Sequence, residues 1–172
     1  MSGFVDAVAV EELERLHTRL RELSATVAVA ESLTGGELCA ALTAPSGAST
    51  VVRGGVVVYA TDLKATLAGV PQPLLAERGA VDPDVALALA SGVRERLRAS
   101  YGLAVTGVAG PDPQDGKPVG TVYVGLAGPA GGYQEGHRFS GSRAEIRAAT
   151  VNAAVRVLRQ ECERAITSLR SP

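Results

Sequence analysis

The sequence has no tryptophan and only six aromatic side chains, four tyrosines and two phenylalanines. Its hydrophobic core therefore has to be built from Val, Leu and Ala, a composition that suits helices packed on a sheet. Basic and acidic residues, 17 and 18 of them, are scattered along the chain and leave a net charge of −1. Without a basic patch or base-stacking aromatics, we expect no nucleic-acid partner.

Sequence features of metal sites, disulfides and membrane spans are also missing. Cys39 and Cys162 lie far apart and lack the spacing of a zinc site or a disulfide framework. With only two histidines besides, we expect neither a metal ion nor another cofactor. No stretch approaches the roughly 20 apolar residues of a membrane span, and the N-terminus lacks the basic start of a secretory signal. We therefore expect a cytoplasmic protein without a membrane partner.

Apolar residues recur with helical and strand periods in alternation along the chain. Helices are predicted at 8–23, 37–43, 62–67, 83–99 and 142–168, and strands at 26–30, 54–60, 103–107, 120–127 and 132–139. This order predicts an α/β fold, a three-layer α/β/α sandwich with a mixed, mostly parallel central sheet, closed by a β-hairpin and a long helix. At 172 residues, the chain fits one domain spanning 1–172.

Two continuous apolar runs, "GGVVVYA" and "LAVTG", predict strands covered on both faces. We expect five of their residues to lie in central strands: Val56, Val57, Val58, Ala104 and Val105.

Polar residues follow the first predicted strand in the sequence "ESLTGG". Ligands of open α/β sheets collect beyond the strand ends. Ser32 is the best candidate nucleophile, because the next helix, opened by Gly35 and Gly36, offers backbone N–H groups to an oxyanion. A serine there is also a common helix cap, and the G-x-S-x-G nucleophile elbow is missing. Glu31 could hold this turn or bind a ligand hydroxyl.

A nucleophilic Ser32 needs a base, and the choice is narrow. His17 lies among the charges of the first helix, and His137 lies in the last strand. The basic residues other than Lys64 and Lys117 are arginines, which stay protonated. Lys64 follows the second strand by one helical turn and could be a neutral base if its surroundings lower its pKa, or else a solvated surface lysine. Tyr59 could orient this lysine, relay a proton, or belong to the core.

Five motifs in order carry a resemblance over 13–159: "AESLTGGELCAALT", "GGVVVYATDLKATLAGV", "GAVDPDVALALASGVRERL", "LAVTGVAGP" and "KPVGTVYVGLA". The chain resembles the CinA C-terminal domain family, the nicotinamide-nucleotide amidohydrolases. It looks like a stand-alone member, because the N-terminal molybdopterin-binding-like domain of longer members has no counterpart here.

The resemblance implies hydrolysis of the carboxamide of nicotinamide mononucleotide to nicotinate mononucleotide and ammonia. The family's serine falls on Ser32, its lysine base on Lys64 and its tyrosine on Tyr59. The threonine of A-V-T-G falls on Thr106, and the arginine near the start of the last helix falls on Arg143 or Arg147. For the reaction so implied, we expect Thr34, Gly35, Gly36 and neighbouring N–H groups to hold the oxyanion, and Arg143 to pair with the substrate phosphate.

Two positions depart from the family pattern. Leu33 stands where many members have cysteine, and the loop 112–116 reads "DPQDG" where members often have several glycines. The family further suggests a homo-oligomer, a dimer or larger. Two alternatives stay open: a nucleotide-binding or regulatory module without turnover, and an amidase that acts on a different amide.

Overall fold

A five-stranded mixed sheet forms the centre of the computed structural model, which describes residues 8–171. The ends of the predicted domain, 1–7 and 172, lie outside the described residues. The strands are β1 (Val27–Glu31), β2 (Val52–Val57), β3 (Tyr101–Gly107), β4 (Thr121–Gly128) and β5 (Gly131–Arg138). Their order is β2-β1-β3-β4-β5, with β2 and β3 parallel to β1 and the pairs β3–β4 and β4–β5 antiparallel. The predicted mixed sheet and hairpin are confirmed.

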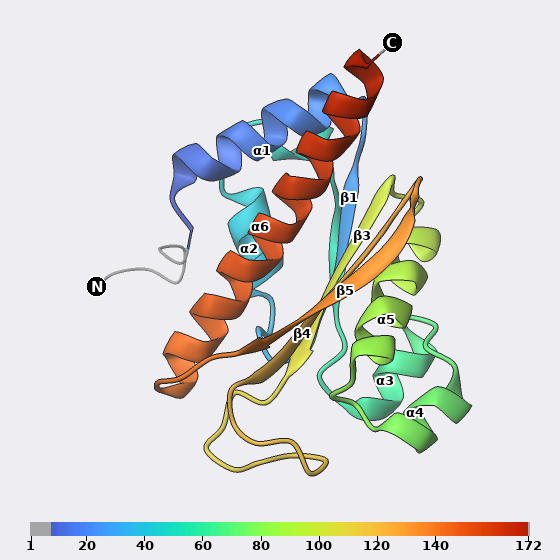
Figure 1. The fold of residues 1–172 in the computed structure, drawn as a ribbon, viewed down its shortest axis with the longest axis vertical. Helices are drawn as coiled ribbons and strands as arrows, with labels where there is room; N and C mark the ends of the chain where they lie inside the picture. Colours follow the sequence, from blue (N-terminus) through green and yellow to red (C-terminus); the bar gives the residue numbers. More distant parts are fainter. Residues whose placement is uncertain (1–7, 172) are drawn as a thin grey trace.

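Helices cover both faces of the sheet (Figure 1). One face carries α1 (Val10–Glu22), α2 (Glu37–Thr43) and α6 (Arg143–Arg170), and the other carries α3 (Thr61–Thr66), α4 (Gln72–Arg78) and α5 (Pro83–Arg96). A short 3₁₀ turn, Ala48–Thr50, precedes β2. The three-layer prediction is confirmed, as is the long last helix. Within residues 8–171, no helix is both long and apolar enough to cross a membrane.

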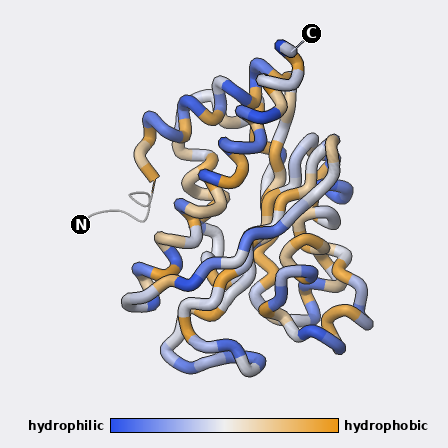
Figure 2. Tube along the Cα trace, viewed as in Figure 1, coloured by the Kyte–Doolittle hydropathy of each residue, from blue (hydrophilic) through white to orange (hydrophobic). Residues whose placement is uncertain are grey.

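Alternation of side chains along the two central strands divides the core into two clusters. Hydrophobic residues gather on these strands and on the helix stripes that face them (Figure 2). One cluster joins Val29 and Leu103 to α1, α2 and α6, whereas the other joins Ala28 and Ala104 to α5. The small alanine side chains on this face of the sheet let α5 pack close to the strands. At Gly102 a Cβ atom would lie 1.9 Å from the Ala90 carbonyl oxygen, so only glycine fits.

Helices α5 and α6 each begin at a residue whose side chain caps the helix. Asp82 caps α5 by accepting a hydrogen bond from the Asp84 backbone N–H at 2.8 Å. Ser142 and Glu145 form a reciprocal capping box at the start of α6. The start of α6 is thereby fixed at the end of the sheet where the candidate site lies.

The prediction of a second strand buried on both faces is wrong. Strand β2 is an edge strand, and its residues alternate between half-buried and exposed. Val56 and Val57 therefore lie at the edge, with 43% of Val57 exposed, and Val58 is buried only after the strand has ended. Ala104 and Val105 lie in the central strand β3, as predicted. A run of valines is compatible with both an edge strand and a central strand, so hydrophobic periodicity did not distinguish the two positions.

Candidate active site

The chain segments that follow β1, β2 and β3 meet at one end of the sheet. These three strands run parallel, so their carboxyl ends share an edge. Ser32 follows β1 directly, Lys64 lies in α3 just after β2, and Thr106 is the penultimate residue of β3. The parallel topology thus gathers residues that are far apart in the sequence.

Lys64 and Ser32 form a buried hydrogen-bonded pair. Lys64 Nζ lies 3.0 Å from Ser32 Oγ, 2.7 Å from the Val58 carbonyl oxygen and 3.5 Å from the Tyr59 carbonyl oxygen. Lys64 is 1% exposed and Ser32 is 8% exposed. Burial lowers the pKa of Lys64 to about 8, against an opposing effect of the negative charge of Asp115.

The contacts of Lys64 match the donors and acceptors of a neutral amine. Such an amine has two N–H donors and one lone pair. Two backbone carbonyls can take the two protons, and the lone pair can then face the hydroxyl proton of Ser32. The arrangement is therefore suited to withdraw a proton from the serine.

Glu31 holds the turn that carries Ser32. Its buried carboxylate accepts hydrogen bonds from the Thr34 hydroxyl at 2.6 Å and from the backbone N–H groups of Gly36, Leu38 and Cys39 at 3.0, 3.0 and 2.8 Å. The three N–H donors are the otherwise unpaired backbone groups at the start of α2. Of the two roles considered for Glu31, the structure shows the structural one.

The glycine N–H groups expected to hold an oxyanion are already engaged. Gly35 N donates to the Ser32 carbonyl oxygen at 3.0 Å, and Gly36 N donates to Glu31. Both glycines have positive φ, 58° and 107°, so their residue type serves the turn. Among the hydrogen bonds of residues 8–171, none is donated by the backbone N–H of Leu33 or Thr34. These two groups directly follow Ser32 in the chain and are the free donors of the turn.

Tyr59 and Arg143 pair with each other away from the amine of Lys64. Arg143 donates one hydrogen bond to the Tyr59 hydroxyl at 2.8 Å and another to the Gly110 carbonyl oxygen at 2.6 Å. The Tyr59 side chain is largely exposed, and only its backbone carbonyl approaches Lys64. The structure does not bring the Tyr59 hydroxyl to the serine and lysine pair.

Arg147 has a different position from Arg143. It pairs with Glu37 at 2.8 Å and donates to the Thr34 carbonyl oxygen at 3.0 Å, which ties α6 to the start of α2. Arg143, in contrast, lies on the wall of the cavity beside Ser32. Of the two arginines left open by the sequence, Arg143 is therefore the one that lines this cavity.

A cavity of about 100 Å³ adjoins the pair. Its wall includes Ser32, Tyr59, Thr106, Asp112 and Arg143. The Thr106 hydroxyl is used internally, because it donates to the Ala80 carbonyl oxygen at 2.6 Å. This volume is below the roughly 300 Å³ of a typical small-molecule site, so it can enclose only one small group of a larger ligand.

Two contributors to the site were not predicted. The Val58 carbonyl oxygen is a backbone group without a sequence signal of its own. Asp115 accepts a hydrogen bond from the Ala80 N–H at 2.9 Å and raises the pKa of Lys64. The pair Asp115-Gly116 marks a turn, and that turn signal was the only available hint.

Within the described part of the chain, no group of three His, Cys, Asp or Glu side chains is placed to hold a metal ion.

Comparison with known proteins shows which family the chain belongs to. A family profile described as "CinA C-terminal domain" matches residues 10–162. The chain belongs to the CinA C-terminal domain family. It is 53% identical over 141 residues to a CinA-like protein of Frankia casuarinae, covering 82% of this chain and 33% of that protein. A CinA-like protein of Anaeromyxobacter is 47% identical, covering 91% of this chain and 39% of that protein.

Solved structures of the family have the same fold. The competence/damage inducible protein CihA of Agrobacterium tumefaciens is similar with a TM-score of 0.83 and 37% identity, covering 92% of this chain and 95% of that one. A CinA superfamily protein of Escherichia coli gives a TM-score of 0.85 and 30% identity, covering 90% and 92%. The chain thus spans nearly all of these two structures, but only about a third of the length of the Frankia and Anaeromyxobacter proteins.

Proposed function

We propose that the chain hydrolyses the carboxamide of nicotinamide mononucleotide, giving nicotinate mononucleotide and ammonia, with Ser32 as nucleophile and Lys64 as base. The observation that carries the proposal is the buried 3.0 Å contact between Lys64 Nζ and Ser32 Oγ. A helix cap or a surface lysine needs no such contact, whereas a serine nucleophile needs a base within hydrogen-bond reach.

In the acylation step, Ser32 Oγ attacks the amide carbon while its proton moves to Lys64 Nζ. The oxyanion forms beside the free N–H groups of Leu33 and Thr34. When the tetrahedral intermediate collapses, the C–N bond breaks and Lys64 returns the proton to the departing nitrogen, which leaves as ammonia. An ester on Ser32 remains.

In the deacylation step, water attacks that ester and Lys64 accepts a proton from the water. The bond between the acyl carbon and Ser32 Oγ then breaks, and Lys64 gives the proton back to the serine. The carboxylic acid leaves in ionised form, and its proton is taken up by the released ammonia to give ammonium. The net reaction consumes one water, and no group outside the chain is needed to balance it.

The small volume of the cavity beside Ser32 favours a substrate that inserts only one end into it. Its 100 Å³ suit a carboxamide and part of its ring, while the remainder of a mononucleotide would extend past Tyr59 toward Arg143. Arg143 can pair with a phosphate through two parallel hydrogen bonds once it releases its present partners. A homo-oligomer, a cytoplasmic location and a single domain over 1–172 remain parts of the proposal.

Ammonia release from a panel of amides tests the proposal. The panel contains nicotinamide mononucleotide, nicotinamide riboside, nicotinamide and glutamine. We expect turnover of the mononucleotide, its loss in Ser32→Ala, and no change in Ser49→Ala, an exposed serine far from the site. Binding of the mononucleotide without ammonia release would instead favour a binding module, and preference for another amide would assign a different substrate.

A further inference from the structure

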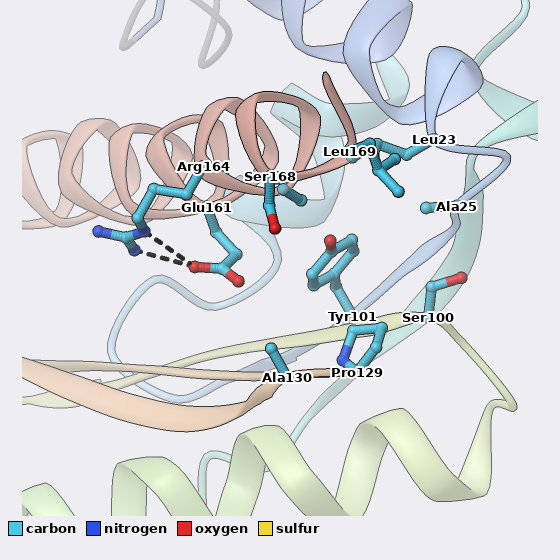
Figure 3. Close-up of a pocket in the computed structure, with 11 residues that line it drawn as sticks. Leu23, Ala25, Ser100, Tyr101, Pro129, Ala130, Glu161, Arg164, Ser168 and Leu169 are labelled. Carbon is cyan, nitrogen blue, oxygen red and sulfur yellow. Dashed lines mark hydrogen bonds and ion pairs between the residues drawn. The ribbon is translucent and has the colours of Figure 1, made fainter. Parts of the chain in front are cut away.

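A second cavity, of about 560 Å³, lies at the opposite end of the sheet from Ser32. The segment before β1, the start of β3, the β4–β5 turn and the last turns of α6 enclose it (Figure 3). The two cavities are separated by the length of β3, roughly 20 Å. The wall of the second cavity is largely apolar, with Leu23, Ala25, Pro129, Ala130, Ala165 and Leu169.

The nearly buried side chain of Tyr101 presents its hydroxyl to this apolar cavity without a partner in the protein. Tyr101 is 3% exposed, and Figure 3 shows its hydroxyl directed toward the last turns of α6, near Ser168. Within residues 8–171 the Tyr101 hydroxyl makes no hydrogen bond. A hydroxyl without a protein partner at the wall of an apolar cavity is a place where a ligand atom can bind.

Glu161 adds a negative charge to the same wall. Arg164 donates two hydrogen bonds to Glu161 Oε2, at 2.9 and 3.1 Å, and stacks over the ring of Tyr133 at 5.1 Å. In the described part of the chain, the other oxygen, Glu161 Oε1, has no partner, and Figure 3 shows it on the side of Tyr101. The cavity thus offers a free acceptor, while its one cation is already engaged.

We propose that this cavity binds a small molecule with an apolar ring or short chain and one hydrogen-bond donor, either an uncharged alcohol or a cationic amine. The donor would bind Glu161 Oε1 and its heteroatom would meet the Tyr101 hydroxyl. The volume lies within the range of small-molecule sites. Anionic ligands are disfavoured by the free carboxylate oxygen. The site therefore differs in charge preference from a phosphate-binding one and does not depend on chemistry at Ser32.

Titration of the protein with three matched probes tests the assignment. Benzylamine, benzyl alcohol and benzoate share a ring and differ in charge and donor. In two-dimensional ¹H–¹⁵N spectra, we expect benzylamine and benzyl alcohol to shift the amides of Tyr101, Ala130 and Ala165 saturably, with dissociation constants of about 1 mM for such small ligands. Benzoate should cause no saturable shifts there.

Four variants separate the cavity from non-specific binding. Ala165→Phe fills the cavity and should abolish the shifts, whereas Ala149→Phe makes the same change elsewhere on α6 and should leave them intact. Tyr101→Phe, which keeps the ring, should weaken binding about twofold to tenfold by removing one hydrogen bond. Glu161→Gln should reduce the preference for benzylamine over benzyl alcohol.

Several outcomes would overturn the assignment. These are equal shifts with benzoate, unchanged binding in Tyr101→Phe and Glu161→Gln, or no saturable shift up to about 10 mM probe, ten times the expected constant. A fourth is protein self-association that masks the Ala130 and Ala165 amides before any probe is added, since it would show that a second copy covers the cavity. If Ala165→Phe does not fold, the two conservative variants still decide the question.

Discussion

Arg143 donates a 2.8 Å hydrogen bond to the hydroxyl of Tyr59, joining the first turn of α6 to the segment after β2 across 84 positions of sequence. Both side chains are largely exposed on the wall of the cavity beside Ser32. In the proposed reaction, a bound mononucleotide would extend toward this guanidinium, and its phosphate would compete with the tyrosine for it.

Arg143→Ala is expected to raise the KM for nicotinamide mononucleotide about tenfold or more, because charge-assisted hydrogen bonds to the phosphate are lost. The KM for nicotinamide riboside, which lacks the phosphate, should not change. Steady-state kinetics with both substrates measures this, with the exposed Arg15→Ala as control. An equal rise of the KM for both substrates would contradict a role of Arg143 in phosphate binding. Tyr59→Phe should raise the KM for the mononucleotide less than Arg143→Ala does.

Ser32→Ala and Lys64→Met are each expected to lower kcat by at least about 10³-fold, and the double variant should lose little more because the two groups act as a unit. Methionine suits the test because Lys64 is buried and an arginine would overfill its site. Single-turnover kinetics measures the rates, and Lys117→Met controls for loss of a lysine. Multiplicative losses in the double variant would show independent roles and contradict the dyad.

The rate is expected to rise with pH, because the base must be neutral and its pKa is about 8. At pH 7 about a tenth of the molecules would carry the neutral amine, so kcat/KM should increase about tenfold toward a plateau above pH 9. Asp115→Asn removes the charge that raises this pKa, and should move the midpoint to lower pH. A pH–rate profile of the two proteins decides this, and an unshifted or upward-shifted midpoint would count against it.

Glu31→Gln is expected to lower the free energy of unfolding by about 2–4 kcal/mol, because an amide group puts a donor against backbone N–H groups that now bind the carboxylate. Thr34→Val removes only one of the four hydrogen bonds and should cost about 1 kcal/mol. Urea denaturation at neutral pH measures both. Equal stabilities of Glu31→Gln and the wild type would show that the turn does not depend on the carboxylate.

Acidification below pH 6.5 is expected to destabilise the fold partly through His17. This residue is 1% exposed beside the backbone of Leu42, and burial lowers its pKa. The unfolded chain then binds a proton that the native state rejects, so stability falls as pH decreases below the unfolded pKa.

His17→Leu should reduce the loss of stability between pH 7.5 and 5.5 by about 1 kcal/mol. Burial also lowers the pKa of His137, so part of the loss should remain. Urea midpoints at the two pH values provide the measurement, and His137→Asn serves as the matched comparison. An unchanged pH dependence in His17→Leu would mean that the buried imidazole does not reject the proton.

The sequence was sufficient for the layers of the fold and for the proximity of Ser32 and Lys64. Periodicity located most of the elements. The position of Ser32 and Lys64 after neighbouring strands made them candidates, and the family resemblance selected them over a helix cap and a surface lysine. The edge position of β2 was missed, because strand order depends on contacts between distant segments. The roles of Glu31, Gly35 and Gly36 also depend on hydrogen-bond partners, and a polar residue type does not reveal whether its partner is a ligand or the chain itself.

Lys64 is held by the carbonyl oxygens of Val58 and Tyr59, which belong to the main chain. Every amino acid supplies such a carbonyl, so the side chains at 58 and 59 can drift in evolution without moving the amine. Alanine scanning would accordingly overlook this support. Only a change to the backbone itself, such as an ester in place of the amide that follows Val58, would weaken the acceptor and reveal how much the positioning of the lysine depends on it.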